Sequence, residues 1–460
     1  MPYIYNTPED QQAMLAAIGA DSLEQLFETI PAEFRLPRPL ELPRALGELE
    51  LTAHLELLAA ANTSPRDTVC FLGGGSYDHF IPAVVDYVAS RGEFYTSYTP
   101  YQPEVAQGNL QAMFEYQTLI CQLTGMEVSN QSLYDGGTAA TEAVLMAISV
   151  SGRQGKVMVA ENVHPEYRET LRTYLERLGT QLVTIATPHG IVEPADLAAA
   201  MDEKTACFLF SQPNFFGALE DAETLVKITH EASALAIVHF DPVSLGLLAR
   251  PGDYGADIVV AEGQSLGTPM QFGGPYLGIM ACREKFVRRL PGRIAGQTVD
   301  RHGRRCFVLT LQTREQHIRR EKATSNICTN QGLFALRAAV YLSAMGPRGL
   351  AEVAELCAQK SAYAKSGLVQ SGRLELAFAA PTFKEFVVRD REGNPEQLVE
   401  QALSRGYFAG VPLGRWYPEL ADCLLVCVTE KRTRAEIDGL AEVIAGARSV
   451  ARSKEVARHA

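Results

Sequence analysis

Between residues 155 and 282 the chain alternates short apolar runs with helical segments, and this alternation restricts the fold more than any other feature. The apolar runs predict strands at residues 156–160, 181–186, 206–210, 235–240, 257–260 and 276–281. The segments between them predict helices at 169–178, 194–201 and 222–232. Strands that are apolar along their whole length are typical of a mostly parallel sheet covered on both faces. An α/β fold is therefore predicted.

The regions on either side of this alternation predict two further parts. Residues 1–62 are expected to form a helical N-terminal segment, broken by prolines at 31, 37, 39 and 43. Residues 63–332 then form the large α/β domain. Beyond it, a long helix leads into mixed helices and strands, which predicts a smaller C-terminal α+β domain at 333–460. The 460 residues are enough for two or three such domains.

Charge and cysteine usage limit the partners and the compartment. The net charge is −12, from 42 basic and 54 acidic residues, so binding to nucleic acid or to an anionic membrane is not expected. The nine cysteines include no Cys-x-x-Cys pair, which favours reduced thiols and no metal site. The N-terminus lacks the pattern of a signal peptide, and no apolar run reaches the roughly 18 residues of a membrane span. A cytoplasmic protein is expected.

Three sequence features in the large domain have the chemistry of a site for a flat, phosphate-bearing cofactor. Gly136, Gly137 and Thr138 open a helix, where free amides can hold a phosphate, although a helix cap explains the same residues. His164 follows the first strand and could stack on a ring, or be an ordinary loop residue. Asp241 ends a buried strand and could pair with a protonated ring nitrogen, or cap the turn that follows.

The order of these three features along the chain matches a pyridoxal phosphate (PLP) site on the aminotransferase-like, type I transferase fold. Such a site also needs a lysine that forms a Schiff base, at the end of a strand shortly after the Asp. The chain has no Lys between Asp241 and Glu284, and Gln264 and Ser265 stand at the expected turn. The sequence therefore predicts a degenerate site that lacks the covalent attachment point.

Several longer segments carry a family resemblance. They lie at residues 72–79, 94–104, 134–139, 291–301 and 312–330, and the last begins Gln-Thr-Arg-Glu-Gln-His-Ile-Arg-Arg-Glu. In these segments the chain resembles glycine decarboxylase, the P-protein of the glycine cleavage system, and within that family the α chain (subunit 1) of the split form. The resemblance covers nearly the whole chain.

The resemblance implies a shared enzyme. P-proteins bind glycine as a PLP aldimine, release its carboxyl carbon as carbon dioxide and pass the aminomethyl group to the lipoyl arm of H-protein. In the split form two α and two homologous β subunits form a heterotetramer, and the β subunit carries the PLP lysine. The missing lysine after Asp241 agrees with an α assignment.

The resemblance also indicates residues that serve the partner's site. Tyr95 and Tyr98 look like residues donated across the subunit interface, or equally like members of an aromatic packing loop. Thr324 and Asn326 lie in a segment that resembles a loop contacting the cofactor phosphate of a neighbouring subunit. Residues 283–322 hold 12 basic against four acidic residues and could receive an acidic H-protein, or form a solvated face with local ion pairs.

Two alternative functions remain open. The chain could be a purely structural, stabilising partner of the PLP-bearing subunit. It could instead be a stand-alone PLP enzyme that uses an unexpected lysine such as Lys322, although that residue does not lie at the end of a predicted strand.

Overall fold

The computed structural model describes residues 6–271, 273–327, 331–370 and 372–457, with side chains to residue 446 in the last helix. The chain divides into two compact units, Met1–Thr63 and Ser64–Ala460. The further division at residue 332 stays a prediction. No helix of the described residues is long and apolar enough to cross a membrane. The eight cysteines within the described part are free thiols, while Cys328 and the end of the 312–330 motif lie outside it.

The N-terminal unit contains two helices joined by an irregular segment. Helix α1 spans Pro8–Ile18, and Thr7 caps it through a hydrogen bond from the amide of Asp10. Helix α2 spans Glu48–Ala60. Between the two helices a short 3-10 turn forms at Glu24–Phe27, and the chain is irregular around the prolines at 31, 37, 39 and 43, as predicted.

The large sheet of the second unit has seven strands in the order β2-β8-β7-β6-β5-β3-β4. Their bounds are Val128–Ser129 (β2), Lys156–Ala160 (β3), Gln181–Ile185 (β4), Thr205–Gln212 (β5), Leu235–Phe240 (β6), Ile258–Glu262 (β7) and Gly278–Cys282 (β8). Strands β3 to β7 pair in parallel, and β8 is antiparallel to β7. The predicted, mostly parallel sheet is therefore confirmed.

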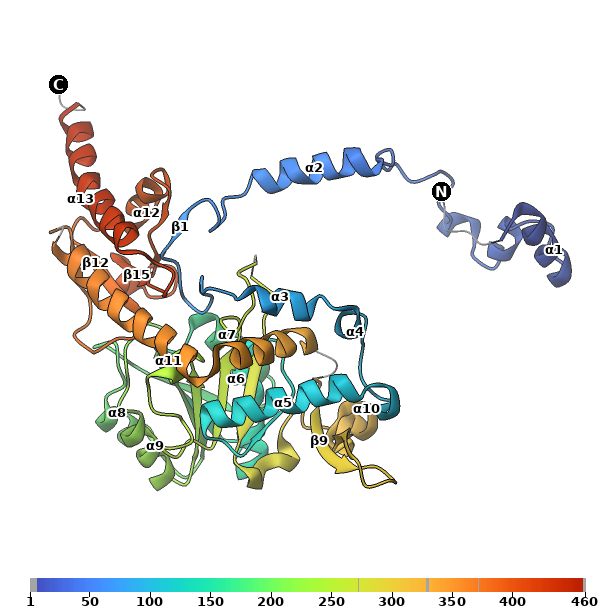
Figure 1. The fold of residues 1–460 in the computed structure, drawn as a ribbon, viewed down its shortest axis with the longest axis horizontal. Coiled ribbons are helices and arrows are strands. Elements are labelled where there is room, and N and C mark those ends of the chain that lie inside the picture. Colours follow the sequence, from blue (N-terminus) through green and yellow to red (C-terminus); the bar gives the residue numbers. More distant parts are fainter. Residues whose placement is uncertain (1–5, 272, 328–330, 371, 458–460) are drawn as a thin grey trace. The chain divides into compact units, whose positions relative to one another are not determined.

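Helices pack around this sheet (Figure 1). They are α5 (Gln107–Thr124), α6 (Gly136–Ser151), α7 (Pro165–Leu175), α8 (Pro194–Ala200) and α9 (Ala222–Glu231). Helix α3 (Ala83–Ala89) packs against α11 (Gly332–Gln370), and α4 (Gly92–Tyr95) follows α3 along the chain. Helix α6 is mostly buried and packs along β5 to β8. Helix α7 begins at Pro165 rather than at the predicted residue 169, because His164 caps it and proline suits the first helical position.

A smaller antiparallel sheet forms the C-terminal part of this unit. Its order is β11-β12-β15-β14, with bounds Leu374–Leu376, Glu385–Asp390, Cys423–Cys427 and Val411–Pro412. It packs with α11 (Gly332–Gln370), α12 (Pro395–Leu403) and α13 (Arg434–Ala457). Helix α11 is kinked at Gly346, which has a φ of 61° and directly precedes Pro347. Strand β1 (Val69–Cys70) pairs with β13 (Tyr407–Phe408).

The basic stretch 283–322 contains a hairpin that was not predicted. Its antiparallel strands are Ile294–Val299 (β9) and Arg305–Thr310 (β10).

The ends of β5, β6 and β7 lie against the small sheet. Phe215 and Phe216, which follow β5, form one buried cluster with Val387 and Leu425 of the small sheet. A β-bridge between Ala218 and Thr382 joins the two parts further. The expected site lies at this junction.

Candidate functional site

The predicted phosphate cradle is occupied by the chain's own side chains. Asp135 accepts a hydrogen bond from the amide of Thr138 over 2.7 Å and caps α6, as the simpler interpretation of the motif required. The amide of Gly136 donates to Glu262 Oε2 over 2.9 Å. A Cβ at Gly136 would lie 2.7 Å from the hydroxyl of Tyr167, so the glycine makes room for this phenol.

Glu262 ends β7 and is buried. Its other oxygen, Oε1, accepts from the amides of Gln264 and Leu277 over 3.0 and 3.1 Å. Burial raises the pKa of Glu262 to about 8, although these backbone hydrogen bonds oppose the shift. An acidic group thus lies where the sequence predicted a phosphate.

His164 stacks on a side chain of this chain. Its Nδ1 accepts from the amide of Glu166, which leaves Nε2 to donate to the carbonyl of Gly74 over 2.8 Å. Its ring lies 4.5 Å from that of Tyr167 at an angle of 22°. Burial lowers the pKa of His164, so a neutral ring is favoured.

Asp241 caps the turn that follows it and also pairs with a cation, but that cation is a lysine of the same chain rather than a ring nitrogen. Its Oδ1 accepts from the amide of Val243 and caps the turn. Its Oδ2 lies 2.6 Å from the ammonium of Lys384, the residue just before β12. The Lys384 side chain is only 1% exposed, and its nitrogen lies 3.5 Å from the centre of the Tyr77 ring. Burial lowers the pKa of Lys384, but the charge of Asp241 raises it above its usual value.

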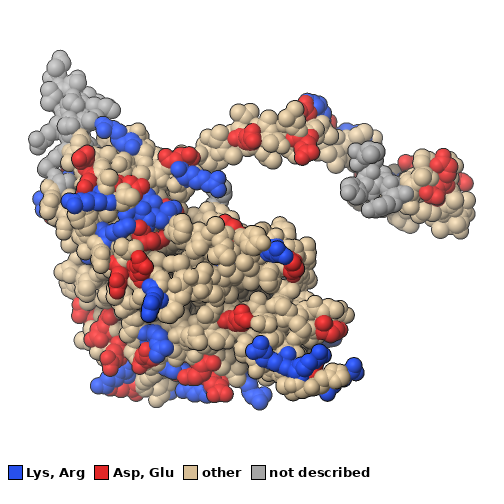
Figure 2. All heavy atoms as spheres, in the orientation of Figure 1, with Lys and Arg blue, Asp and Glu red and all other residues tan. Residues whose placement is uncertain are grey.

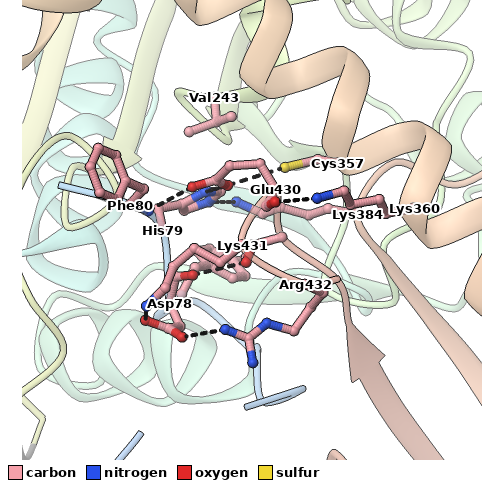
Figure 3. Close-up of polar contacts among 12 residues, drawn as sticks. Asp78, His79, Phe80, Val243, Cys357, Lys360, Lys384, Glu430, Lys431 and Arg432 are labelled. Carbon is pink, nitrogen blue, oxygen red and sulfur yellow. Dashed lines mark hydrogen bonds and ion pairs between the residues drawn. The ribbon is translucent and has the colours of Figure 1, made fainter. Parts of the chain in front are cut away.

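Lys384 also joins a chain of buried polar groups (Figure 3). Its ammonium lies 3.0 Å from His79 Nε2, and His79 Nδ1 lies 2.6 Å from Glu430 Oε2. Cys357 contacts the same carboxylate, and Lys360 donates to the carbonyl of Glu430.

His79, Cys357 and Glu430 form the only metal-like cluster among the residues that the structure describes. Both ring nitrogens of His79 are already engaged, and one of them faces an ammonium. A metal cation is therefore disfavoured here, and the absence of a metal stays a prediction.

Gln264 stands where the Schiff-base lysine was expected and is held on three sides. Its Oε1 accepts from the amide of Tyr77, and its Nε2 donates to the carbonyls of Tyr77 and Thr268. The residue is 1% exposed. The neighbouring Ser265 is buried as well.

These residues do not fit PLP. A cavity of about 40 Å³ remains among the side chains near Tyr167, His239 and Asp241, which is room for a few water molecules. The stacked ring, the cationic partner of Asp241 and the acidic partner of Gly136 are all supplied by the chain itself. No reaction step is therefore assigned to this site.

The residues expected to serve a partner lie elsewhere, near the surface. Tyr95 ends α4 and is 68% exposed, and Tyr98 is 80% exposed. Tyr98 lines an open pocket of about 280 Å³, together with Asn109, Gln131 and the buried Arg293.

Thr324 lines a second, smaller hollow beside this pocket. The hollow is bordered by Arg288, Arg289 and Glu315, and Glu315 lies 3.6 Å from Arg293 of the first pocket. Asn326 is exposed. The structure thus separates the predicted residues into a degenerate site at the sheet junction and a second group of which Tyr95, Tyr98 and Asn326 are exposed and Thr324 is half-buried.

The comparisons with known proteins agree with this fold. A family model described as "Glycine cleavage system P-protein" matches residues 1–444. The chain belongs to this family. Proteins named "Probable glycine dehydrogenase (decarboxylating) subunit 1" are 52% identical in Desulforamulus reducens and 50% identical in Moorella thermoacetica. The alignments cover 96% and 97% of this chain and 98% and 99% of those relatives.

Solved structures add the three-dimensional match. A glycine decarboxylase (P-protein) structure in inhibitor-bound form is 43% identical, with a TM-score of 0.89 over 97% of this P-protein chain and 100% of that one. A cysteine desulfurase from Thermococcus onnurineus is 14% identical, with a TM-score of 0.62 over 83% of this chain and 94% of that one, and shows the fold alone. The resemblance to P-protein subunit 1 and the type I PLP-transferase fold are both confirmed.

Three central residues of this P-protein site were missed from the sequence: Tyr167, Glu262 and Lys384. Each carried a weak signal. Tyr167 lies three residues after His164, and Glu262 ends a strand two residues before Gln264. Lys384 directly precedes a strand with an apolar centre, Phe386–Val388, where a charged residue needs a partner.

Proposed function

We propose that this chain is the subunit of glycine decarboxylase that carries no Schiff-base lysine, and that it completes the active site of a homologous, PLP-bearing β subunit. In the assembled enzyme PLP supplies an electron sink for the release of the glycine carboxyl carbon as carbon dioxide. The aminomethyl group then passes to the lipoyl arm of H-protein. A cytoplasmic heterotetramer of two α and two β chains is part of the same proposal.

The observation that carries the proposal is the filled site. Gln264 stands at the expected lysine position, and Asp241 is neutralised by Lys384 rather than left to a ring nitrogen. Lys322, the alternative lysine, is exposed and lies in a 3-10 turn outside the sheet junction. These contacts favour a role without bound cofactor over a stand-alone PLP enzyme.

A surface suited to the partner lies over α3, α4 and the first part of α11, where Figure 2 shows a broad area with few charged atoms. Large apolar and aromatic side chains are exposed along the segment 80–105: Phe80, Val84, Tyr87, Tyr95, Tyr98, Tyr101 and Val105. Exposed apolar patches of this kind mark protein interfaces. We propose that the β subunit covers this face and receives the phenols of Tyr95 and Tyr98.

The basic stretch 283–322 divides into two classes of arginine. Arg314 is largely buried and donates to the carbonyls of Leu290 and Gly292, so it stabilises the fold. Arg301 and Arg304 are exposed at the tip of the β9–β10 hairpin. Only the exposed class can attract an acidic H-protein.

The proposal is tested with the chain co-purified with its β partner, by measuring glycine–bicarbonate exchange. Tyr95→Phe and Tyr98→Phe each remove one hydroxyl, and Thr324→Val removes another. A hydrogen bond from a phenol to a charged substrate group is worth about 1.5–3 kcal/mol, so we expect about a 10- to 100-fold loss of activity in at least one tyrosine variant. The thermal midpoint of this chain without its partner should stay unchanged, because both phenols are exposed in the single chain.

Tyr87→Phe is the matched control, since Tyr87 is 64% exposed on the same face. It should keep its activity within about twofold, as expected for a surface change. Full activity in all three test variants would favour the purely structural role. Exchange activity in this chain without any partner would refute the proposal.

A further inference from the structure

The side chains that fill the degenerate site correspond to the parts of the cofactor that they exclude. The planar ring of Tyr167 stacks on the ring of His164, with the ring centres 4.5 Å apart. The same ring lies so close to Gly137 that a Cβ there would be 3.0 Å from it. The ammonium of Lys384 lies 2.6 Å from Asp241, the place of a protonated ring nitrogen.

The third part is the anionic end. Glu262 accepts from the first amide of α6, at Gly136, which is the position where a helix end holds a phosphate. The same carboxyl group accepts from the amides of Gln264 and Leu277, so it is fixed on both sides.

We infer that Tyr167, Lys384 and Glu262 together form a built-in replacement for PLP, which supplies the ring, the positive nitrogen and the acidic end from within the chain. This inference rests on the proposed function, since it requires that the chain holds no cofactor. The inference goes beyond the proposed function because it assigns a structural role to these three residues. They keep the fold of a cofactor-binding protomer complete when no cofactor is bound.

Lys384 is the central residue of this replacement, because it joins the two sheets. It directly precedes β12 of the small sheet, and Asp241 follows β6 of the large sheet. His79, which contacts Lys384 in Figure 3, belongs to the loop that leads to α3. That loop continues to Tyr95 and Tyr98 on the partner-facing surface. The ion pair therefore positions the segment that we propose to serve the β subunit.

The charge of Lys384, rather than its bulk, is what the inference requires. Removing one member of a buried ion pair leaves the other charge without a partner, whereas replacing both by neutral groups of similar size is often tolerated. A double-mutant cycle distinguishes these cases. The variants are Lys384→Met, Asp241→Asn and the two combined. Lys285→Met is the control, because it removes the ammonium of an exposed ion pair: the Lys285 side chain is 67% exposed and its nitrogen lies 3.8 Å from Asp257 Oδ1.

Thermal unfolding is measured on the chain assembled with its β partner. We expect each single variant to lower the midpoint by about 4–6 °C, and the double variant to lie within about 2 °C of the unaltered protein. The control should move by less than about 1 °C. Equal midpoints for all variants, or a double variant whose loss is the sum of the two singles, would overturn the inference.

A second experiment, chemical rescue of a single variant, gives an answer even when one member of the cycle assembles poorly. In Lys384→Ala the missing atoms correspond to n-propylammonium, and 1-propanol is the neutral probe of the same length. We expect the ammonium salt to restore at least half of the lost midpoint and the alcohol to restore much less. Equal restoration by the two probes would show that only packing matters and would overturn the inference.

The failure of the proposed function gives a different signal. Borohydride treatment of the unaltered assembly, followed by mass spectrometry of each chain, should place the pyridoxyl adduct on the partner. An adduct on this chain would refute the proposed function. A flat mutant cycle without such an adduct would refute only the built-in replacement.

Discussion

Gln264→Lys restores a lysine to the expected Schiff-base position, and we predict that the variant still does not take up PLP. The reason is space and charge rather than the missing amine. Tyr167 already stacks on His164, and Lys384 already neutralises Asp241. The new lysine would face a site that has room for only a few water molecules.

The size of the accompanying destabilisation follows from the contacts of Gln264. A lysine can still donate to the carbonyls of Tyr77 and Thr268, but it cannot accept from the amide of Tyr77, which now donates over 2.8 Å. A buried amide without an acceptor costs about 1–3 kcal/mol. Burying an extra ammonium adds about as much again, so we expect a total loss of about 2–6 kcal/mol. For a unit of this size that lowers the thermal midpoint by about 2–7 °C.

The assay incubates the variant assembly with excess PLP, reduces it with borohydride and looks for a pyridoxyl adduct on this chain by mass spectrometry. Gln264→Met is the control, since it removes all three hydrogen bonds of Gln264 without adding a charge or an amine. It should form no adduct under the same treatment. A stoichiometric adduct on the introduced lysine would refute the reasoning, because it would show that the site accepts the cofactor as it stands.

Three further predictions concern pH and metals. Burial raises the folded-state pKa of Glu262 to about 8, so the folded chain keeps a proton that the unfolded chain loses near pH 4.5. The free energy of unfolding should therefore fall as the pH rises from about 4.5 to 8, and Glu262→Gln should reduce this slope in urea titrations. An unchanged slope would contradict the assignment. Burial is the largest single effect on Glu430 and raises its pKa, but the hydrogen bond and charge of His79 and the backbone hydrogen bonds together lower the pKa to about 2. The stabilisation by Glu430 is therefore complete above about pH 4.5 and lost as the pH falls toward 2. Glu430→Gln should be less stable than the unaltered chain at pH 7 and nearly equal to it at pH 2, and an equal difference at both values would count against this. Prolonged EDTA treatment of the assembly should change neither activity nor thermal midpoint, since Lys384 opposes a cation near His79. A loss that zinc reverses would disprove this.

The strands of the large sheet could be predicted because a central parallel strand is buried on both faces and so is apolar throughout. Strands β3 and β6 lie at the predicted residues, and β4, β5, β7 and β8 differ from the prediction by only a few positions at their ends. The two-residue strand β2 was not predicted. The hairpin of β9 and β10 escaped prediction because its arginines hide a modest alternation in which only Phe307 and Leu309 of β10 are buried. Helix starts were less certain, since caps such as His164 act through local geometry.

The degenerate site was only half predictable. The positions of Gly136, His164 and Asp241 followed from their places at strand and helix ends, where α/β folds gather polar groups. Whether those groups hold a ligand or a neighbouring side chain depends on what lies opposite, and no local pattern carries that information. Asp241 offered a ring-nitrogen contact and a turn cap, and the structure shows the cap together with a lysine.

The sequence alone determined the α/β class, the P-protein family and the absence of a lysine after Asp241, because these depend on periodicity, motifs and residue identity. Only the tertiary structure decided what fills the space that a cofactor would take. Lys384 and His79 are 305 positions apart and meet only when the small sheet closes on the large one. A contact of that range depends on the packing of the whole unit, since chain entropy opposes it and only the combined burial of both sheets holds it in place.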